Sequence, residues 1–178
     1  MTTHTFILPS GETVLIDAVD RDLVEAAGPW YALRNQNTTY VTANRLRSAG
    51  SHTTVRLHRL ILDPPDDLHV DHINRDGLDN RRINLRTCTR SQNQANSPSR
   101  IGSSRFKGVY WDKVNAKWRA QGCDGTGINL RLGRFANEYE AARAYDVHAT
   151  ETYGEFAWLN ADHFVMPDVT VLDDRGAA

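Results

Sequence analysis

The sequence predicts an α+β protein, because two separate segments each place short strands before a helix. In residues 68–95, two runs of alternating apolar and polar residues flank a polar loop, and a short helical segment follows them. In residues 105–160, three such runs come before one amphipathic helical segment. A period of two indicates a strand, and apolar residues three and four apart indicate a helix.

The first sixty residues predict a small β-rich module. Phe6–Leu8 and Val14–Ile16 flank Pro9-Ser10-Gly11, which is typical of a hairpin. Asp20 is expected to cap a short helix that ends near Gly28-Pro29. Further strands are expected at 30–33, 40–47 and 54–62.

Residues 68–95 are expected to form a strand, a loop, a second strand and a helix. The first strand ends in Asp71-His72, and the loop contains Asp76, Gly77 and Asn80. Thr89 is expected to cap the helix, which carries Asn93 in its first turns. A helix that crosses the hairpin can bring Asn93 toward the strand end that carries Asp71.

A carboxylate and an amide from separate elements suit a hard cation. Mg²⁺ keeps several waters and needs few protein ligands, so Asp71 and Asn93 can share one ion with water and a substrate phosphate. The adjacent His72 has an ordinary pKa near neutrality, which suits a general base. The segment therefore predicts a phosphodiester-cleaving site.

The spacing of Asp71-His72, Asn84 and Asn93 resembles the HNH endonuclease family, in particular the variant with a DH…N…N pattern found in phage and intron-encoded homing endonucleases. The resemblance covers about residues 58–97 and implies the ββα-metal fold. It implies that Asp71 and Asn93 hold one divalent cation, that His72 activates the attacking water, and that Asn84 braces the loop. The expected products carry 5′-phosphate and 3′-hydroxyl ends.

The oxygen ligands distinguish this chain from family members that have histidines at the metal positions. They favour Mg²⁺ or Mn²⁺ over zinc, and no structural zinc is expected. His58 precedes the motif in an apolar run. A packing role or a phosphate contact fits it better than catalysis does.

Four arginines surround the expected metal site, and guanidinium groups there can bind phosphates on either side of the cut. A solvated surface explains them equally simply. They are Arg75, Arg81, Arg82 and Arg86.

Residues 105–160 are expected to form a sheet with one polar, basic face and one apolar face. In the second strand Lys117, Arg119 and Gln121 alternate with Trp118 and Ala120. A helix that begins after Asn137 would cover the apolar face. A twisted sheet of this kind fits the DNA major groove.

This region is similar to the DNA-binding domain of the plant ethylene-response factors (Apetala type), which is also known from phage nucleases. The matching runs are FKGV, KWRA, LGRF, EAARAYD and a closing LN. Tyr110 and Arg131 replace residues of the plant pattern, so the plant target sequence does not transfer. The resemblance implies DNA contacts by Lys107, Tyr110, Lys117, Arg119, Gln121, Asn129 and Arg131.

Charge is unevenly distributed, although the whole chain has a net charge of −1. Residues 69–135 contain 13 Lys and Arg against 5 Asp and Glu, and the rest of the chain is acidic. Such a block attracts polyanions. Two cysteines without a C-x-x-C pair, and the lack of an apolar membrane-length run, indicate a cytoplasmic protein.

Five parts are therefore expected: a β-rich module at 1–57, a nuclease core at 58–97, a linker at 98–104, a DNA-binding domain at 105–160 and an acidic tail at 161–178. The leading hypothesis is a homing-type endonuclease on double-stranded DNA, without a nucleotide cofactor, as a monomer or a homodimer and with one or both strands cut. The alternatives are a DNA-binding regulator with a disused nuclease hairpin and a protein that only coats DNA.

Overall fold

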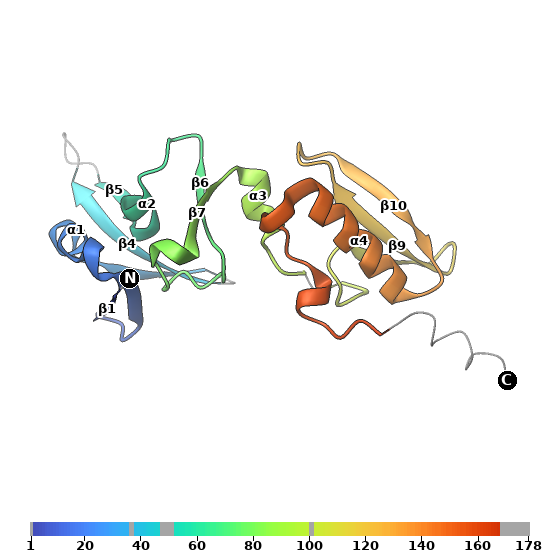
Figure 1. The fold of residues 1–178 in the computed structure, drawn as a ribbon, viewed down its shortest axis with the longest axis horizontal. Helices are drawn as coiled ribbons and strands as arrows, with labels where there is room; N and C mark the ends of the chain where they lie inside the picture. Colours follow the sequence, from blue (N-terminus) through green and yellow to red (C-terminus); the bar gives the residue numbers. More distant parts are fainter. Residues whose placement is uncertain (1, 36–37, 47–51, 100–101, 168–178) are drawn as a thin grey trace. The chain divides into compact units, whose positions relative to one another are not determined.

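The computed structural model describes residues 2–35, 38–46, 52–99 and 102–167. The chain divides into two compact units, Met1–Asn93 and Gln94–Ala178, and each has its own core (Figure 1). The expected α+β class is confirmed, with small antiparallel sheets and helices in both units. The end of the expected strand at residue 47 and the tail beyond residue 167 lie outside the described residues. Within the described ranges, no helix is long and apolar enough to cross a membrane.

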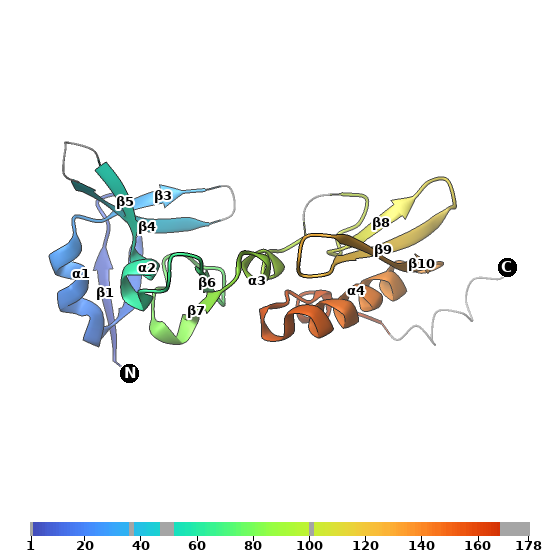
Figure 2. The ribbon, with the colours of Figure 1, turned by 90° about the horizontal axis from the view of Figure 1, so that it is seen from above.

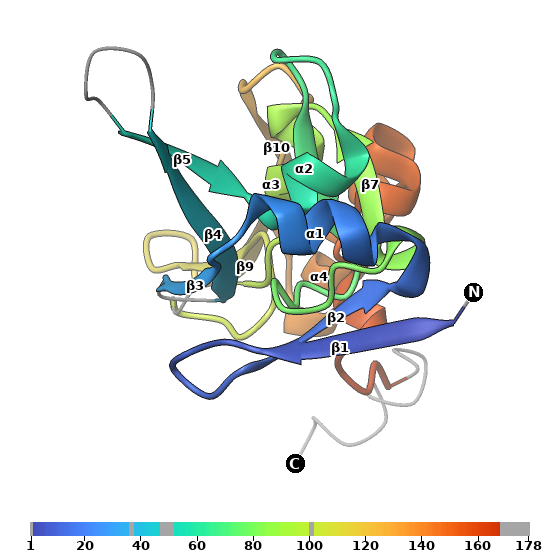
Figure 3. The same ribbon diagram turned by 90° about the vertical axis from the view of Figure 1, so that its left-hand side faces the viewer.

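The first unit consists of three small antiparallel sheets and short helices (Figures 1 and 3). The expected first hairpin is present, and Figure 3 shows it beside α1. The sheets are β1-β2, β3-β4-β5 and β6-β7. In chain order the elements are β1 (Thr3–Ile7), β2 (Thr13–Asp17), η1 (Ala18–Asp20), α1 (Arg21–Ala27), β3 (Tyr31–Arg34), β4 (Thr39–Leu46), β5 (His52–Arg56), α2 (Leu57–Leu62), β6 (His69–His72), η3 (Arg82–Asn84), β7 (Leu85–Cys88) and α3 (Arg90–Ala95).

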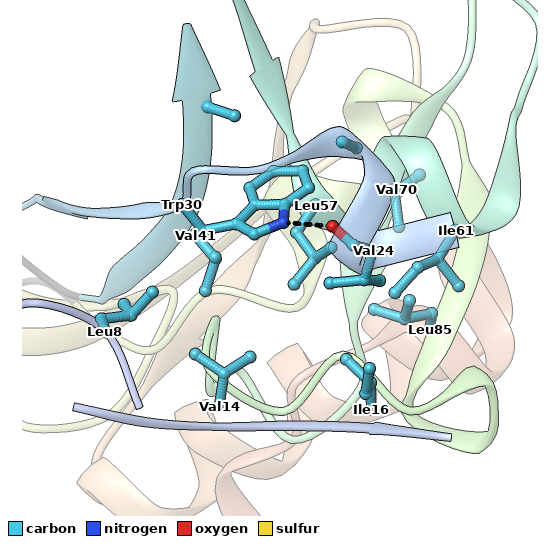
Figure 4. Close-up of a cluster of buried hydrophobic side chains, with 12 residues drawn as sticks. Leu8, Val14, Ile16, Val24, Trp30, Val41, Leu57, Ile61, Val70 and Leu85 are labelled. Atoms are coloured by element: carbon cyan, nitrogen blue, oxygen red, sulfur yellow. Dashed lines mark hydrogen bonds between the residues drawn. The ribbon is translucent and has the colours of Figure 1, made fainter. Parts of the chain in front are cut away.

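One hydrophobic core joins the N-terminal strands to the β6–β7 hairpin. It runs from Leu8 on the first hairpin, through Val14 and Leu57, to Val70 and Leu85 on β6 and β7 (Figure 4). Burial of one such side chain contributes about 1.5–3 kcal/mol. The expected boundary between residues 57 and 58 therefore has no counterpart, because both sides bury their apolar residues together.

The expectation of a strand over 54–62 is wrong in its second half. β5 ends at Arg56, and α2 follows directly with Leu57 and Ile61 buried on one face. A spacing of four residues is typical of a helix. The apolar run is so short, however, that its pattern alone does not distinguish a helix from a strand. The helix ends at Leu62 and is capped by Asp63, whose backbone is left-handed (φ 44°) and whose N–H donates to the Arg59 carbonyl at 2.9 Å.

The helix expected after Asp20 is present, but the Asp20 side chain makes no capping hydrogen bond. Its carboxylate instead accepts two hydrogen bonds from Arg82, at 2.7 and 2.9 Å. A stronger charged partner therefore takes the oxygens that a cap would use.

The second unit is a three-stranded antiparallel sheet covered on one face by a long helix (Figure 2). The strand order is β10-β9-β8, and Figure 2 shows α4 along one side of the sheet. Ala120 of β9 and Ala141 and Ala142 of α4 are fully buried at the contact, since small side chains let the helix approach closely. The elements are β8 (Val109–Asp112), β9 (Lys117–Cys123), β10 (Asn129–Phe135), α4 (Glu138–Tyr153), η4 (Gly154–Phe156) and η5 (Asn160–Asp162).

Polar contacts fix the start of α4 and the position of η5 against this helix. The predicted cap Asn137 is confirmed, because its Oδ1 accepts the Tyr139 N–H at 2.8 Å. The buried Asp146 accepts hydrogen bonds from the Asn160 backbone and side chain and from the Ala161 N–H, at 2.8–2.9 Å. These contacts join the D of EAARAYD to the N of the closing LN.

The segment expected to be a linker is partly packed against the second unit. Ser104 is buried and donates to Glu138 at 2.7 Å, and Ser103 accepts the Trp111 N–H at 2.8 Å. The boundary between the compact units falls earlier, after Asn93. Residues 100 and 101 of the segment lie outside the described residues.

Candidate active site and nucleic-acid interface

Asp71 and His72 lie on the β6–β7 hairpin and point to its opposite faces. Asp71 pairs with Arg86 and His72 pairs with Leu85 in the antiparallel register. Successive side chains on a strand alternate between faces. His72 therefore shares a face with the core residue Leu85, while Asp71 shares the other face with Arg86.

The Asp71 carboxylate is buried and bound to arginine. It is 5% exposed, and its Oδ2 accepts hydrogen bonds from Arg86 Nε and Nη2 at 3.0 and 2.8 Å. The expected metal ligand and one expected phosphate-binding arginine are thus direct partners. Any cation that binds Asp71 has to share this carboxylate with the guanidinium or displace it.

His72 is enclosed by aromatic rings from two other elements. It is 4% exposed, and the His58 ring on α2 meets it edge-on, with centroids 5.0 Å apart. The centroid of the Tyr40 ring, on β4, lies 5.5 Å from that of the His58 ring and 6.0 Å from that of the His72 ring. Burial lowers the pKa of His72 below its ordinary 6.5. The imidazole is therefore neutral at physiological pH, as a general base must be.

His58 lies in a packing position and not at a surface where it could contact phosphate. It is 3% exposed, and its Nδ1 has no hydrogen-bond partner among the described residues. Burial, reinforced by the neighbouring His72, lowers the pKa of His58 to about 3. Of the two roles considered from the sequence, only packing agrees with this position.

Asn84 holds the loop between the two strands closed. Its Oδ1 accepts the Asn74 N–H at 3.0 Å, and its Nδ2 donates to the Asp79 carbonyl at 2.7 Å and to Asn74 Oδ1 at 2.9 Å. Its carbonyl accepts the Ile73 N–H at 2.9 Å. These are contacts of the kind that a loop-bracing residue makes.

The imidazole itself contacts a different asparagine, which the sequence placed only in the polar loop. Asn80 Oδ1 lies 3.3 Å from His72 Nε2. The residues are eight positions apart in an irregular loop, so no periodic pattern marks the contact.

Two further arginines expected to bind DNA are engaged in ion pairs. Arg81 contacts Asp79 at 2.7 and 2.8 Å, and Arg82 contacts Asp20 at 2.7 and 2.9 Å. Both aspartates are buried. Arg75 is half-buried and has a left-handed backbone (φ 65°). Phosphate binding by these side chains remains a prediction, and Arg81 and Arg82 also stabilise the loop.

Asn93 lies in α3, whose start matches the expectation. Thr89 Oγ1 accepts the Gln92 N–H at 3.2 Å, and Gln92 Oε1 accepts the Thr89 N–H at 2.8 Å, which is a capping box. The Asn93 N–H donates to the Thr89 carbonyl at 3.0 Å, and its side chain is half-buried.

The donor set fits a weakly held hard cation better than zinc. Among the described residues, no group of three or more His, Cys, Asp or Glu side chains is arranged to hold a metal. Asp71 and Asn93 offer a carboxylate and an amide oxygen, which suit an ion that keeps most of its waters. A structural zinc site needs four nitrogen or sulfur ligands.

The open face of the C-terminal sheet gathers six of the seven expected DNA-contact residues. Cross-strand partners share a face, and Tyr110 pairs with Arg119 while Gln121 pairs with Arg131. The Arg119 guanidinium lies 5.9 Å from the centre of the Tyr110 ring. By the same alternation the face comprises Tyr110, Lys117, Arg119, Gln121, Asn129 and Arg131.

Lys107 differs from the other six. It precedes β8, and its ammonium donates to the Ala95 and Ser97 carbonyls, both at 2.6 Å. Its backbone N–H donates to Asn160 Oδ1 at 2.7 Å. Lys107 therefore lies outside the open face, and its contact with DNA stays a prediction.

Arg134 is a basic residue of the open face that strict alternation does not identify. A bulge between Arg131 and Gly133 shifts the register, so Arg134 pairs with Arg119 and joins its face. The ion pair with Asp112 of β8, at 2.9 Å, lowers the pKa of that carboxyl to about 2. Gly133, with φ 147°, is the sequence signal, since a glycine inside a strand often marks a bulge.

Comparison with known proteins identifies the class of the hairpin segment. Residues 63–95 match the model of the HNH endonuclease family. A relative, described as an uncharacterized HNH endonuclease of Acanthamoeba polyphaga mimivirus, is 34% identical over 116 residues. The match covers 62% of this chain and 59% of that protein, so the chain spans less than two thirds of its relative. No solved structure matches the chain.

The matched segment contains all four residues of the expected catalytic and metal site and the four arginines around it. It ends at residue 95, before the C-terminal sheet begins. The family match therefore does not bear on the expected ethylene-response-factor domain, which stays a prediction.

Proposed function

We propose that this chain is a site-specific DNA endonuclease of the homing type. The hairpin hydrolyses a phosphodiester bond, and the open sheet face selects the site on double-stranded DNA. The observation that carries the proposal is the match between the HNH endonuclease family and the segment that contains Asp71 and His72, which are consecutive residues of β6.

Each part of the candidate site has one role in the proposed reaction. His72 accepts a proton from the attacking water, and Asn84 keeps the loop closed around it. Asp71 and Asn93 would hold one Mg²⁺ or Mn²⁺, which neutralises charge on the phosphate and on the departing 3′ oxygen. The products would carry 5′-phosphate and 3′-hydroxyl ends.

The open sheet face supplies the proposed DNA contacts. Lys117, Arg119, Arg131 and Arg134 place four positive charges on it, and the Asp112 carboxylate balances one of them. Side chains on such a face contact phosphates and base edges when a sheet enters the major groove.

A plasmid assay tests the proposal. Supercoiled DNA is incubated with Mg²⁺ or Mn²⁺ and the wild-type chain, His72→Ala or His69→Ala. His69 is an exposed neighbour on the same strand, so it is the matched control. We expect nicking by the wild type and by His69→Ala but none by His72→Ala, with equal DNA affinity for all three in chelator. Equal loss of cleavage and affinity in His72→Ala contradicts the assignment.

A second candidate is a regulator that binds DNA without cutting it. The ion pair between Asp71 and Arg86 favours it, since the expected metal ligand is already neutralised by a side chain. The same assay separates the candidates: the regulator leaves the plasmid supercoiled while a footprint shows a specific site.

A further inference from the structure

Asn80 is held in place by both its backbone and its surroundings. It is 0% exposed, and its N–H donates to the Leu15 carbonyl at 2.7 Å. The Leu15 N–H in turn donates to the Leu78 carbonyl at 2.9 Å, so β2 is hydrogen-bonded to the loop on both sides of residue 79. The position of the Asn80 side chain is therefore fixed relative to the core.

The direction of the Asn80 amide is fixed by a second contact. Its Nδ2 donates to the Gly77 carbonyl at 3.1 Å. A carbonyl only accepts, so it must face the NH₂ end of the amide, and the oxygen end must face His72. Gly77 cannot move aside easily, because its N–H donates to Thr38 Oγ1 at 3.1 Å and a Cβ there would lie 2.3 Å from the Thr39 carbonyl oxygen.

We propose that Asn80 is a positioning residue that holds His72 in the tautomer with the proton on Nε2, so that Nδ1 is the base in the cleavage reaction. The amide oxygen 3.3 Å from Nε2 can only accept, which requires that Nε2 carry the hydrogen. A neutral imidazole has one N–H, so Nδ1 keeps the lone pair.

The chemical role of Nδ1 rests on the proposed endonuclease function, whereas the tautomer itself does not. In that reaction an O–H bond of water breaks and an N–H bond forms at Nδ1. The water oxygen then bonds to phosphorus as the bond from phosphorus to the 3′ oxygen breaks. The 3′ oxygen takes a proton from solvent and Nδ1 gives its proton to solvent, which completes the hydrolysis and restores the neutral imidazole.

Nitrogen NMR of the metal-free, ¹⁵N-labelled full chain tests the tautomer without any need for cleavage. Two-bond ¹H–¹⁵N correlations distinguish a protonated from an unprotonated ring nitrogen, and the His72 signals are those that His72→Ala loses. At mildly alkaline pH we expect a protonated Nε2 and an unprotonated Nδ1. A proton on Nδ1, or an even mixture, overturns the proposal whether or not any variant folds.

Substitutions test the part played by Asn80. Asn80→Asp keeps an acceptor and should keep the wild-type pattern, whereas Asn80→Leu should lose the protonated Nε2 signal. Asn74→Leu is the control, because Asn74 belongs to the same loop and contacts Asn84 and Asp79. An unchanged pattern in folded Asn80→Leu, or the same change in Asn74→Leu, contradicts the role of Asn80.

Cleavage by the same variants separates the two proposals. If His72 has the expected tautomer and the wild type cuts DNA, the kcat of Asn80→Leu should fall at least roughly tenfold with little change in KM. The kcat of Asn80→Asp should fall less. The expected tautomer in a chain that never cuts DNA would refute the endonuclease and leave the positioning role intact. Cleavage by a chain whose His72 carries its proton on Nδ1 would support the endonuclease and refute the positioning role of Asn80.

Discussion

The guanidinium of Arg82 binds the carboxylate of Asp20, 62 residues earlier in the chain, at 2.7 and 2.9 Å. The Arg82 backbone N–H also donates to Asp17 at 2.8 Å. These bonds attach the loop of the β6–β7 hairpin to the end of β2 and the start of α1. The loop geometry around His72 therefore depends on residues far outside the matched segment.

Loss of the Arg82 side chain should destabilise the first unit. Asp20 is buried, so Arg82→Met leaves a carboxylate without its charged partner, and we expect unfolding free energy to fall by about 1–3 kcal/mol. Urea unfolding measures this. Arg21→Met is the control, because its ion pair with Glu25 is exposed and should contribute little to stability. Unchanged stability with weaker DNA binding would assign Arg82 to phosphate contact alone.

Removal of the Asn93 amide should weaken metal binding without unfolding the chain. We expect Asn93→Ala to reduce Mn²⁺ affinity at least roughly tenfold, measured by electron paramagnetic resonance. Gln94→Ala, at the exposed neighbouring position, should bind Mn²⁺ like the wild type.

Asp71→Asn should differ from Asn93→Ala in its effect on stability. It should also lose Mn²⁺, but it removes the partner of the mostly buried Arg86, so thermal unfolding should occur at a lower temperature. Wild-type Mn²⁺ affinity in Asn93→Ala would remove Asn93 from the metal site.

The open sheet face should determine the salt dependence of DNA binding. Each substitution of Lys117, Arg119 or Arg131 by Gln should reduce the slope of log affinity against log salt by about one unit for each lost phosphate contact. Arg134→Gln should behave in the same way, because the bulge turns that residue to the same face.

Arg105→Gln is the control for this face. Arg105 lies against Phe164 and the Tyr139 hydroxyl instead of on the open face. Its substitution should leave the slope unchanged, and an effect of Arg105 alone would move the interface to the helix side of the sheet.

His58 should make the first unit less stable in acid. Its pKa is about 3 in the folded chain against 6.5 when exposed, so only the unfolded chain gains a proton as pH falls below about 6.5. Stability should therefore be greatest above that pH and decline toward pH 3, by about 2 kcal/mol between pH 7 and pH 5.

His58→Phe should remove this part of the decline while keeping an aromatic ring beside His72. Chemical unfolding across this pH range provides the measurement, and His52→Phe, at an exposed position, should show the wild-type decline. An equal decline in His58→Phe would mean that other groups cause it.

The sequence predicts those features of the site that depend on neighbouring residues. The hairpin around Asp71 and His72 follows from local alternation, and the start of α3 follows from the capping residue Thr89. The two faces of β9 likewise follow from a period of two.

Features that depend on distant residues or on a local irregularity are not predicted by sequence patterns. The pairing of Arg82 with Asp20 joins parts of the chain that no pattern connects. One extra residue near Gly133 reverses the face of Arg134. A pattern of only six residues, the length of α2, does not distinguish a helix from a strand. For this reason the sequence places His58 in a strand instead of a helix.

The shared core sets a practical limit on how the β6–β7 hairpin can be isolated. A fragment cut to the matched segment, or beginning at residue 58, would leave behind the partners of Val70 and Leu85 and expose their side chains to water. Such a peptide should aggregate or remain unfolded. Anyone who transplants this hairpin into another protein must carry the preceding strands with it.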